Sequence, residues 1–197
     1  MHSCVYVIIG KTGNIASLVA KTMHPFDEDL KVKPYKLHLS ASTVETMARR
    51  YQLPVNAHAA LLKKMPDWMG CSGGKDRLGL YARCSHNPDG KWDWYEIGGR
   101  YNGRIRGVQA PRPYQPTADI GTNTLAADEL LRSDDFSKRV PHAVLTPHGE
   151  WIERSSFNST MSGWYVREEP SRLWQQRVRR ILRTFVDYRV VCVDAHS

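Results

Sequence analysis

The side chains best suited to chemistry are concentrated in one segment, residues 91–103, which has the sequence KWDWYEIGGRYNG. Two carboxylates, Asp93 and Glu96, precede a pair of glycines, and Arg100 follows the pair directly. Carboxylic acids and imidazoles can exchange protons with a substrate, so these carboxylates and His196 suit general acid–base catalysis. We therefore expect Asp93, Glu96 and His196 to be the catalytic residues if the protein is an enzyme.

His196 lies two residues after Asp194, at the end of an expected strand. Two residues apart on a strand, both side chains can point into the same cleft and form an acid–base pair. The alternative is that these residues near the end of the strand are simply solvated.

The segment also predicts a ligand site, because aromatic rings stack on nucleotide bases and arginine forks match phosphate oxygens. Adjacent glycines allow the backbone to bend or a ligand to approach it closely. The residues expected to bind are Trp92, Trp94, Tyr95, Gly98, Gly99, Arg100, Tyr101 and Arg104. Neither an H-E-x-x-H nor a C-x-x-C spacing occurs, so we expect no metal site and no cofactor.

A purely structural interpretation of the same residues stays open. Two tryptophans on a strand are typical of a hydrophobic core, and the carboxylates can form internal salt bridges with Arg100. In a strand, Trp92, Trp94 and Glu96 share one face, while Asp93 and Tyr95 share the other. Three ionisable groups around two glycines are nevertheless costly to bury for packing alone.

Hydrophobic periodicity and turn residues predict the elements that position this segment. Strands are expected at residues 5–9, 92–97, 101–108, 142–146, 150–153 and 189–193. Helices are expected after a cap at Thr12, at residues 42–51, 56–64 and 123–132, and from a cap at Ser171 along a face that includes Trp174, Val178 and Leu182. Residues 66–90 are rich in glycine, proline, serine and asparagine, so a loop is expected there.

Two hairpins are expected, residues 92–97 with 101–108 around Gly98-Gly99, and residues 142–146 with 150–153 around Pro147-His148-Gly149. Strand and helix runs are mixed along the chain. The predicted fold is therefore α+β, a single domain over residues 1–197 with an antiparallel or mixed sheet and helices packed mainly on one face.

Charge, hydrophobicity and cysteine content indicate the expected partners and location of the protein. The 197 residues carry a formal net charge of +8, which favours anionic partners such as nucleotides or nucleic acid. No apolar run is long enough to cross a bilayer, and the four cysteines form no zinc pattern, so a cytoplasmic protein without a membrane partner is expected. Arginines on the helix that begins at Ser171 form either a solvated face or a surface that contacts phosphates.

The stretch from Asn87 to Gly103 resembles the motif NP-x-x-KWDWY-x-IGGR-[WY]-x-G of a widespread, mostly uncharacterised family of small phage and bacterial proteins. Residues 145–151, LTPHGEW, are similar to the family's TP-x-GEW hairpin, and residues 190–196, VVCVDAH, resemble its terminal VVD-x-H. The chain departs from the family pattern at Tyr101, His148 and Ala195. Ala195 stands where relatives often have a cysteine, which disfavours a cysteine-dependent mechanism there.

The resemblance implies a phage-type accessory protein, which would then act in the host cytoplasm. We expect it to bind a small phosphorylated or nucleotide ligand, and a counter-defence role that sequesters a host nucleotide signal would make a host defence component a further partner. One alternative is a hydrolase that acts on a phosphodiester or glycosidic bond. Another is a structural or protein-interaction module, and a homo-oligomer is compatible with each.

Overall fold

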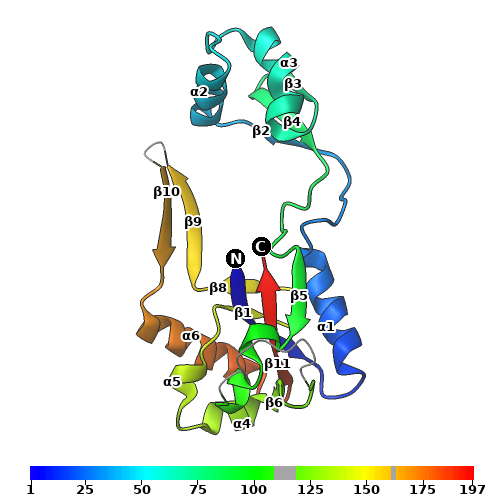
Figure 1. The fold of residues 1–197 in the computed structure, drawn as a ribbon, viewed down its shortest axis with the longest axis vertical. Helices are drawn as coiled ribbons and strands as arrows, with labels where there is room; N and C mark the ends of the chain where they lie inside the picture. Colours follow the sequence, from blue (N-terminus) through cyan, green and yellow to red (C-terminus); the bar gives the residue numbers. More distant parts are fainter. Residues whose placement is uncertain (109–118, 161–162) are drawn as a thin grey trace. The chain divides into compact units, whose positions relative to one another are not determined.

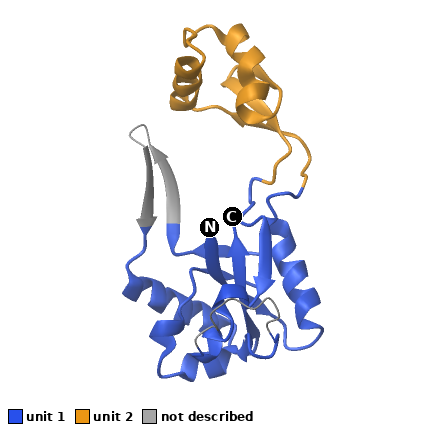
Figure 2. Ribbon diagram, viewed as in Figure 1, with its two compact units in different colours: residues 1–30, 88–197 blue, residues 31–87 orange. Residues whose placement is uncertain are grey.

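The computed structural model describes residues 1–108, 119–160 and 163–197 and contains two compact units (Figure 2). The larger unit comprises residues 1–30 and 88–197, and the smaller one comprises residues 31–87. Helix makes up 37% and strand 27%, and the main sheet is mixed, which confirms the α+β prediction. That the whole chain behaves as one domain stays a prediction.

The larger unit is built on a sheet with the strand order β5-β11-β1-β7-β8 (Figure 1). The central strands β1 (His2–Ile9) and β11 (Arg189–His196) are antiparallel along their whole length. The neighbours of these two strands are β5 (Trp94–Ile97), β6 (Thr124–Ala126), β7 (Ala143–Leu145) and, beyond β7, β8 (Trp151–Glu153). β5 pairs with the C-terminal half of β11 and β6 with its N-terminal half, whereas β7 runs parallel to β1.

Helices cover both faces of this sheet, because alternate residues of β1 are apolar on each side. Val5, Val7 and Ile9 pack with residues of α1 (Ile15–Met23). Tyr6 and Ile8 pack on the opposite face, where the helices are α4 (Ala127–Arg132), α5 (Phe136–Arg139) and α6 (Ser171–Thr184). Most helices of this unit therefore lie on one face, as expected from the sequence.

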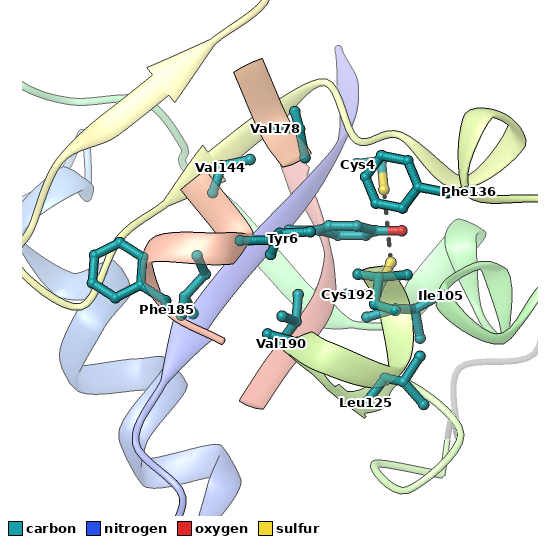
Figure 3. Packing of buried hydrophobic residues seen from close by; sticks show 14 of the residues in the cluster. Cys4, Tyr6, Ile105, Leu125, Phe136, Val144, Val178, Phe185, Val190 and Cys192 are labelled. Carbon is teal, nitrogen blue, oxygen red and sulfur yellow. Dashed lines mark hydrogen bonds between the residues drawn. The ribbon is translucent and has the colours of Figure 1, made fainter. Parts of the chain in front are cut away.

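Tyr6 lies at the centre of the core beneath α6, next to the contact between Cys4 and Cys192 (Figure 3). The two sulfur atoms are 3.7 Å apart, and both cysteines are free thiols. The Tyr6 hydroxyl donates a hydrogen bond to the carbonyl oxygen of Arg139. Burial raises the pKa of Tyr6 well above its ordinary value, so this phenol stays protonated and acts as a structural donor.

The chain enters and leaves the smaller unit through two segments that are hydrogen-bonded to each other. The amide of Glu28 donates to the carbonyl of Trp92 at 2.9 Å, and the amide of Lys91 donates to the carbonyl of Phe26 at 2.8 Å. Phe26 belongs to the 3₁₀ turn η1 (His24–Phe26), which follows α1. Residues 31–87 are therefore an insertion whose two ends are joined at the larger unit.

The smaller unit has the order β2 (Tyr35–His38), α2 (Ala41–Arg50), α3 (His58–Met69), β3 (Gly73–Asp76) and β4 (Gly79–Cys84). Its antiparallel sheet has the strand order β2-β4-β3. Met47 from α2 and Leu61 and Met65 from α3 form a core with the β4 residues Leu80 and Ala82. The unit thus has a hydrophobic core of its own.

The prediction that residues 66–90 form a loop was wrong. Helix α3 continues through Pro66 to Met69, and β3 and β4 form a hairpin. The glycines that suggested a loop serve close packing instead: a Cβ on Gly73 would lie 2.6 Å from the carbonyl oxygen of Tyr81, and one on Gly74 would lie 2.5 Å from the Tyr81 hydroxyl.

The predicted strand at residues 101–108 was also wrong. The chain forms two 3₁₀ turns there, η2 (Gly99–Tyr101) and η3 (Arg104–Arg106), because glycines at positive φ reverse it repeatedly. Three smaller differences concern helix starts. Asn14, not Thr12, caps α1 through the amide of Ser17; Pro170 takes the cap position expected for Ser171; and residues 124–126 are a strand that precedes α4.

The remaining elements follow the sequence patterns closely. The hairpin β7–β8 forms around the predicted turn, and α6 buries Trp174, Val178 and Leu182 as expected. Strands β9 (Ser155–Thr160) and β10 (Gly163–Glu168) form a separate two-stranded sheet. Within the described ranges, no helix is both long enough and apolar enough to span a membrane.

The smaller unit should lose stability in acid through Asp76. Its hydrogen bond with Lys36, at 2.9 Å, lowers the pKa of Asp76 to about 2 from its ordinary value of 3.8. The folded state therefore holds this carboxylate ionised, and the stability it contributes is present above pH 4 and is lost as the pH falls from about 4 to about 2. We expect Asp76→Asn to flatten the pH dependence in that window, measured by urea unfolding, and an unchanged profile would contradict this role.

Candidate functional site

Strand register brings a polar cluster together at one end of the main sheet. His2 on β1 is paired with His196 on β11, which is paired in turn with Trp94 on β5. Two residues further along each strand, and so on the same face, Asp194 on β11 lies opposite Glu96 on β5. Because residues paired across strands share a face, all five side chains lie on the side of the sheet that carries Tyr6. We call these residues, together with Asp93, the histidine–carboxylate cluster.

Each histidine of the cluster is held by its own carboxylate. His196 Nδ1 is 2.8 Å from Asp93 Oδ1, and His2 Nδ1 is 2.9 Å from Asp194 Oδ1. The two imidazole rings are 5.0 Å apart between centroids. A carboxylate at Nδ1 selects the tautomer that carries its proton there, which leaves Nε2 as the basic nitrogen. In the part of the chain that the structure describes, neither Nε2 atom has a hydrogen bond.

His196 therefore pairs with Asp93 and not with Asp194, the partner expected from their spacing. The amide of Asp93 donates to the carbonyl of His196 at 3.0 Å, which aligns the residue just before β5 with the end of β11. Both side chains are partly exposed, at 39% for His196 and 45% for Asp93. The hydrogen bond with His196 lowers the pKa of Asp93, so its carboxylate stays ionised at neutral pH.

Asp194 is fully buried and explains the pair of glycines. One of its oxygens binds His2, and the other accepts a hydrogen bond at 2.9 Å from the backbone amide of Arg100. Gly99 has a φ of +49°, and a Cβ at this position would lie 2.5 Å from the Cβ of Asp194. The glycine pair thus lets the backbone wrap over a buried carboxylate, and the amide of Gly98 donates to the carbonyl of Cys192 below it.

Glu96 lies in an unfavourable environment for a charge. Burial and the adjacent charge of Asp194 raise its pKa, and its Oε2 atom is buried without a hydrogen-bond partner among the described residues. A carboxyl group with a raised pKa and an unpaired oxygen atom is better suited to exchanging a proton than to stabilising the core. Buried polar atoms without a partner are few in native proteins, and a catalytic role is one of their explanations.

Replacement of Glu96 by glutamine should stabilise the protein at pH 7 by about 1 kcal/mol, because like charges opposite each other on neighbouring strands destabilise a sheet. The raised pKa means that the folded state takes up a proton more readily, so the advantage of Glu96→Gln should shrink as the pH falls. Urea unfolding at pH 7 and pH 5 measures this. Glu150→Gln, an exposed site in the β7–β8 turn, is the matched control, and equal effects at both sites would contradict the assignment.

Trp94 and Arg100 are the predicted binding residues that remain accessible. Trp94 is 46% exposed, and its ring lies edge-on to that of His2 with 6.0 Å between the ring centroids. Arg100 uses its backbone amide to hold Asp194, while its side chain is exposed. Its guanidinium has no ion pair within the described ranges.

No protein family, curated protein or solved structure matches this chain. Among the described residues, no group of three or more histidine, cysteine, aspartate or glutamate side chains is placed to hold a metal ion.

The other predicted aromatic residues serve packing in this structure. Trp92 is only 8% exposed and donates from Nε1 to the carbonyl of Met23 at 3.1 Å. Tyr95 contacts the Trp92 ring edge-on at 4.9 Å, and both belong to the core on the α1 face, opposite the cluster. The structure therefore does not bring Trp92 and Tyr95 together with Trp94.

Tyr101 and Arg104 support the cluster from the side. The Tyr101 hydroxyl donates to the backbone carbonyl of His2 at 3.2 Å, which fixes the beginning of β1. Arg104 lies over the Tyr101 ring and donates to the carbonyl of Val140 at 3.2 Å. We therefore interpret both as positioning residues.

Sequence reasoning missed His2 and the role of Asp194 as the partner of His2. His2 precedes the strand expected at residues 5–9 and has no local partner in the sequence. Only the antiparallel pairing of β1 with β11 brings it next to His196. The sequence signal that could have been used is the alternation of Asp194 and His196 along β11. It indicates that one face of this strand is polar, but it does not indicate which strands pair with it.

Proposed function

We propose that the larger unit hydrolyses a phosphodiester bond in a small nucleotide at the histidine–carboxylate cluster. The observation that supports this most directly is the pair of imidazoles, each oriented through Nδ1 by a carboxylate and separated by 5.0 Å between ring centroids. Two imidazoles so close to each other can serve a single reacting phosphate, one as general base and the other as general acid.

The reaction requires only water and the two rings. The neutral imidazole removes a proton from water as the water oxygen forms a bond to phosphorus. The bond between phosphorus and the leaving oxygen breaks, and the protonated imidazole donates its proton to that oxygen. The products are a phosphomonoester and an alcohol, and one water molecule is consumed. Exchange of one proton with solvent at each ring restores the starting protonation states.

Trp94 and Arg100 supply the expected binding contacts. An exposed indole next to His2 offers a surface on which a base can stack, and base–aromatic stacking contributes about 1–3 kcal/mol. An exposed guanidinium without an ion pair in the described residues can reach a phosphate with a bidentate fork. Asp93 and Asp194 hold the histidines, and Glu96 is a further group able to exchange a proton.

The cluster favours phosphodiester over glycoside chemistry. Glycosidases place two carboxyl groups on either side of the scissile bond. Asp194 is fully buried and both its oxygens are hydrogen-bonded, to His2 and to the Arg100 amide, so it is not free to flank a sugar. If Asp93 and Glu96 were the two carboxyl groups of a glycosidase, the sugar would have to bind between them. The two histidines lie on that same face of the sheet.

A second candidate function is binding of the same ligand without cleavage. The exposure of Trp94 and Arg100 supports this second function. Stacking on the indole and phosphate binding by the guanidinium would be sufficient to sequester a nucleotide. Such a protein would suit the counter-defence role that the family resemblance implies. The two functions share one ligand class and differ in the fate of the ligand.

One experiment separates them. The protein is incubated with a panel of cyclic and linear nucleotides, and the thermal shift is measured because ligands that bind only the folded state raise its stability. Each ligand is then recovered after denaturation and analysed by chromatography. A phosphomonoester product supports hydrolysis, and a thermal shift with intact ligand supports sequestration. Neither a shift nor a product from any nucleotide would contradict both and favour a structural role for the cluster.

A further inference from the structure

The positive charge of the protein is concentrated in the smaller unit. Residues 31–87 contain ten lysines and arginines and three aspartates and glutamates, a formal net charge of +7 with histidine neutral. The larger unit has eighteen basic and seventeen acidic residues, a net charge of +1. Nearly all of the excess charge thus lies in 57 of the 197 residues. A field concentrated in this way attracts a polyanion to that unit specifically.

The order of elements in this unit, two helices followed by a hairpin, is compatible with that of modules that read duplex DNA. Two helices, α2 and α3, are followed by the hairpin β3–β4, and β2 completes the sheet on the far side of β4. In helix-turn-helix proteins the second helix enters the major groove, and in their winged forms a following hairpin lies against the neighbouring backbone. The connection between α2 and α3, residues 51–57, is longer than the usual turn of three or four residues.

The exposed face of α3 has the character expected of a groove-binding helix. Leu61 and Met65 are buried against the sheet, while Ala59, Lys63, Lys64, Pro66 and Asp67 are exposed, so this face carries two lysines and one aspartate. With twelve residues, α3 is about 18 Å long, which suits insertion into a major groove about 12 Å wide. Lys63 has no ion pair or hydrogen bond from its side chain within the described residues.

The hairpin adds a second basic site. Its turn connects Asp76 to Gly79 and exposes Arg77 and Leu78, the latter at 71%. The Arg77 side chain has no partner in the described part of the chain. Lys75 on β3 is exposed, and its Nζ lies 2.8 Å from His58 Nδ1, so the hairpin contacts the start of α3.

We propose that the smaller unit binds duplex DNA, with α3 in the major groove and the β3–β4 turn on the adjacent phosphate backbone. Lys63 on the helix and Arg77 in the turn contact phosphates. Phosphate contacts of this kind give affinity that is largely independent of sequence and falls with salt. The activity is separate from the chemistry proposed for the larger unit.

The test measures binding of the full chain to a fluorescein-labelled duplex of about 30 base pairs by anisotropy at 50, 100 and 200 mM NaCl. With about four phosphate contacts, affinity should fall about 10²-fold over this range. The double variant Lys63→Gln/Arg77→Gln should bind about tenfold more weakly at 100 mM and reduce the slope of log K against log salt by about 2. Both side chains are exposed, so thermal unfolding should be unchanged.

The matched control is Arg172→Gln/Arg183→Gln on α6, which removes the same charge from two exposed positions in the larger unit. We expect it to retain wild-type affinity within about twofold. Equal losses in both double variants would overturn the assignment to α3 and the hairpin. So would the absence of salt-dependent duplex binding, or tighter binding of single-stranded DNA or RNA of the same length. Variants of His2 and His196 should bind DNA like wild type, which keeps this test independent of the hydrolysis proposal.

Discussion

Replacement of His196 by glutamine should lower the rate of phosphodiester cleavage by about 10²- to 10⁴-fold, the contribution typical of a general acid or base. His2→Gln should have an effect of the same order, since each ring transfers one of the two protons. Both histidines are partly exposed, and a glutamine amide can still donate a hydrogen bond to the carboxylate, so the variants should fold. Initial rates for the nucleotide found by the product screen, with circular dichroism as a check on folding, measure the effect.

The pH profile of these variants assigns the two roles. Wild type should show a bell-shaped dependence of kcat/KM, because one imidazole must be neutral and the other protonated. Loss of the general base removes the acidic limb, and loss of the general acid removes the alkaline limb. The control is His24→Gln, an exposed histidine in η1 outside the cluster, which should behave like wild type. Retention of full activity by either cluster variant would contradict the mechanism.

Gly99→Ala should destabilise the protein by about 3 kcal/mol. The positive φ of +49° disfavours any side chain, and the added methyl group would lie 2.5 Å from the Cβ of Asp194. Backbone strain and overpacking each contribute about 1–3 kcal/mol. Relief of the overlap would move the Arg100 amide away from Asp194, so catalytic activity should fall together with stability. Urea unfolding followed by tryptophan fluorescence measures the loss.

Gly149→Ala separates the two causes. Gly149, in the turn between β7 and β8, has a φ of +79° but no heavy atom within 4 Å of the position that a Cβ would take. It therefore tests backbone conformation without overlap and should lose about 1 kcal/mol. If Gly99→Ala and Gly149→Ala lose the same stability, the short distance between Gly99 and Asp194 does not contribute to the destabilisation.

Local patterns predicted the elements whose residues carry their own signal. The β-branched run at the start of the chain became β1, the turn Pro147-His148-Gly149 became the β7–β8 hairpin, and the apolar stripe from Trp174 became α6. Local patterns failed where a glycine allows two parts of the chain to pack closely. Gly73 and Gly74 make room for Tyr81, and Gly99 makes room for Asp194.

The candidate site was only partly predictable because its geometry depends on strand order. Asp93 and His196 were expected as acid–base residues from their types, but their hydrogen bond requires β5 to pair with β11. His2 enters the cluster only because β1 lies on the other side of the same strand. Such non-local register is set by the packing of both sheet faces and leaves no mark in the spacing of residues along the chain.

The insertion of residues 31–87 between β1 and its partners also determines the order in which the chain can fold during synthesis. Pairing within the insertion is local, so it can acquire its structure soon after leaving the ribosome. β1 must wait much longer, because the strands on its two sides, β7 and β11, begin only at Ala143 and Arg189. Until then its row of valines and isoleucines has no native partner, which makes this nascent strand the segment most in need of protection by a chaperone.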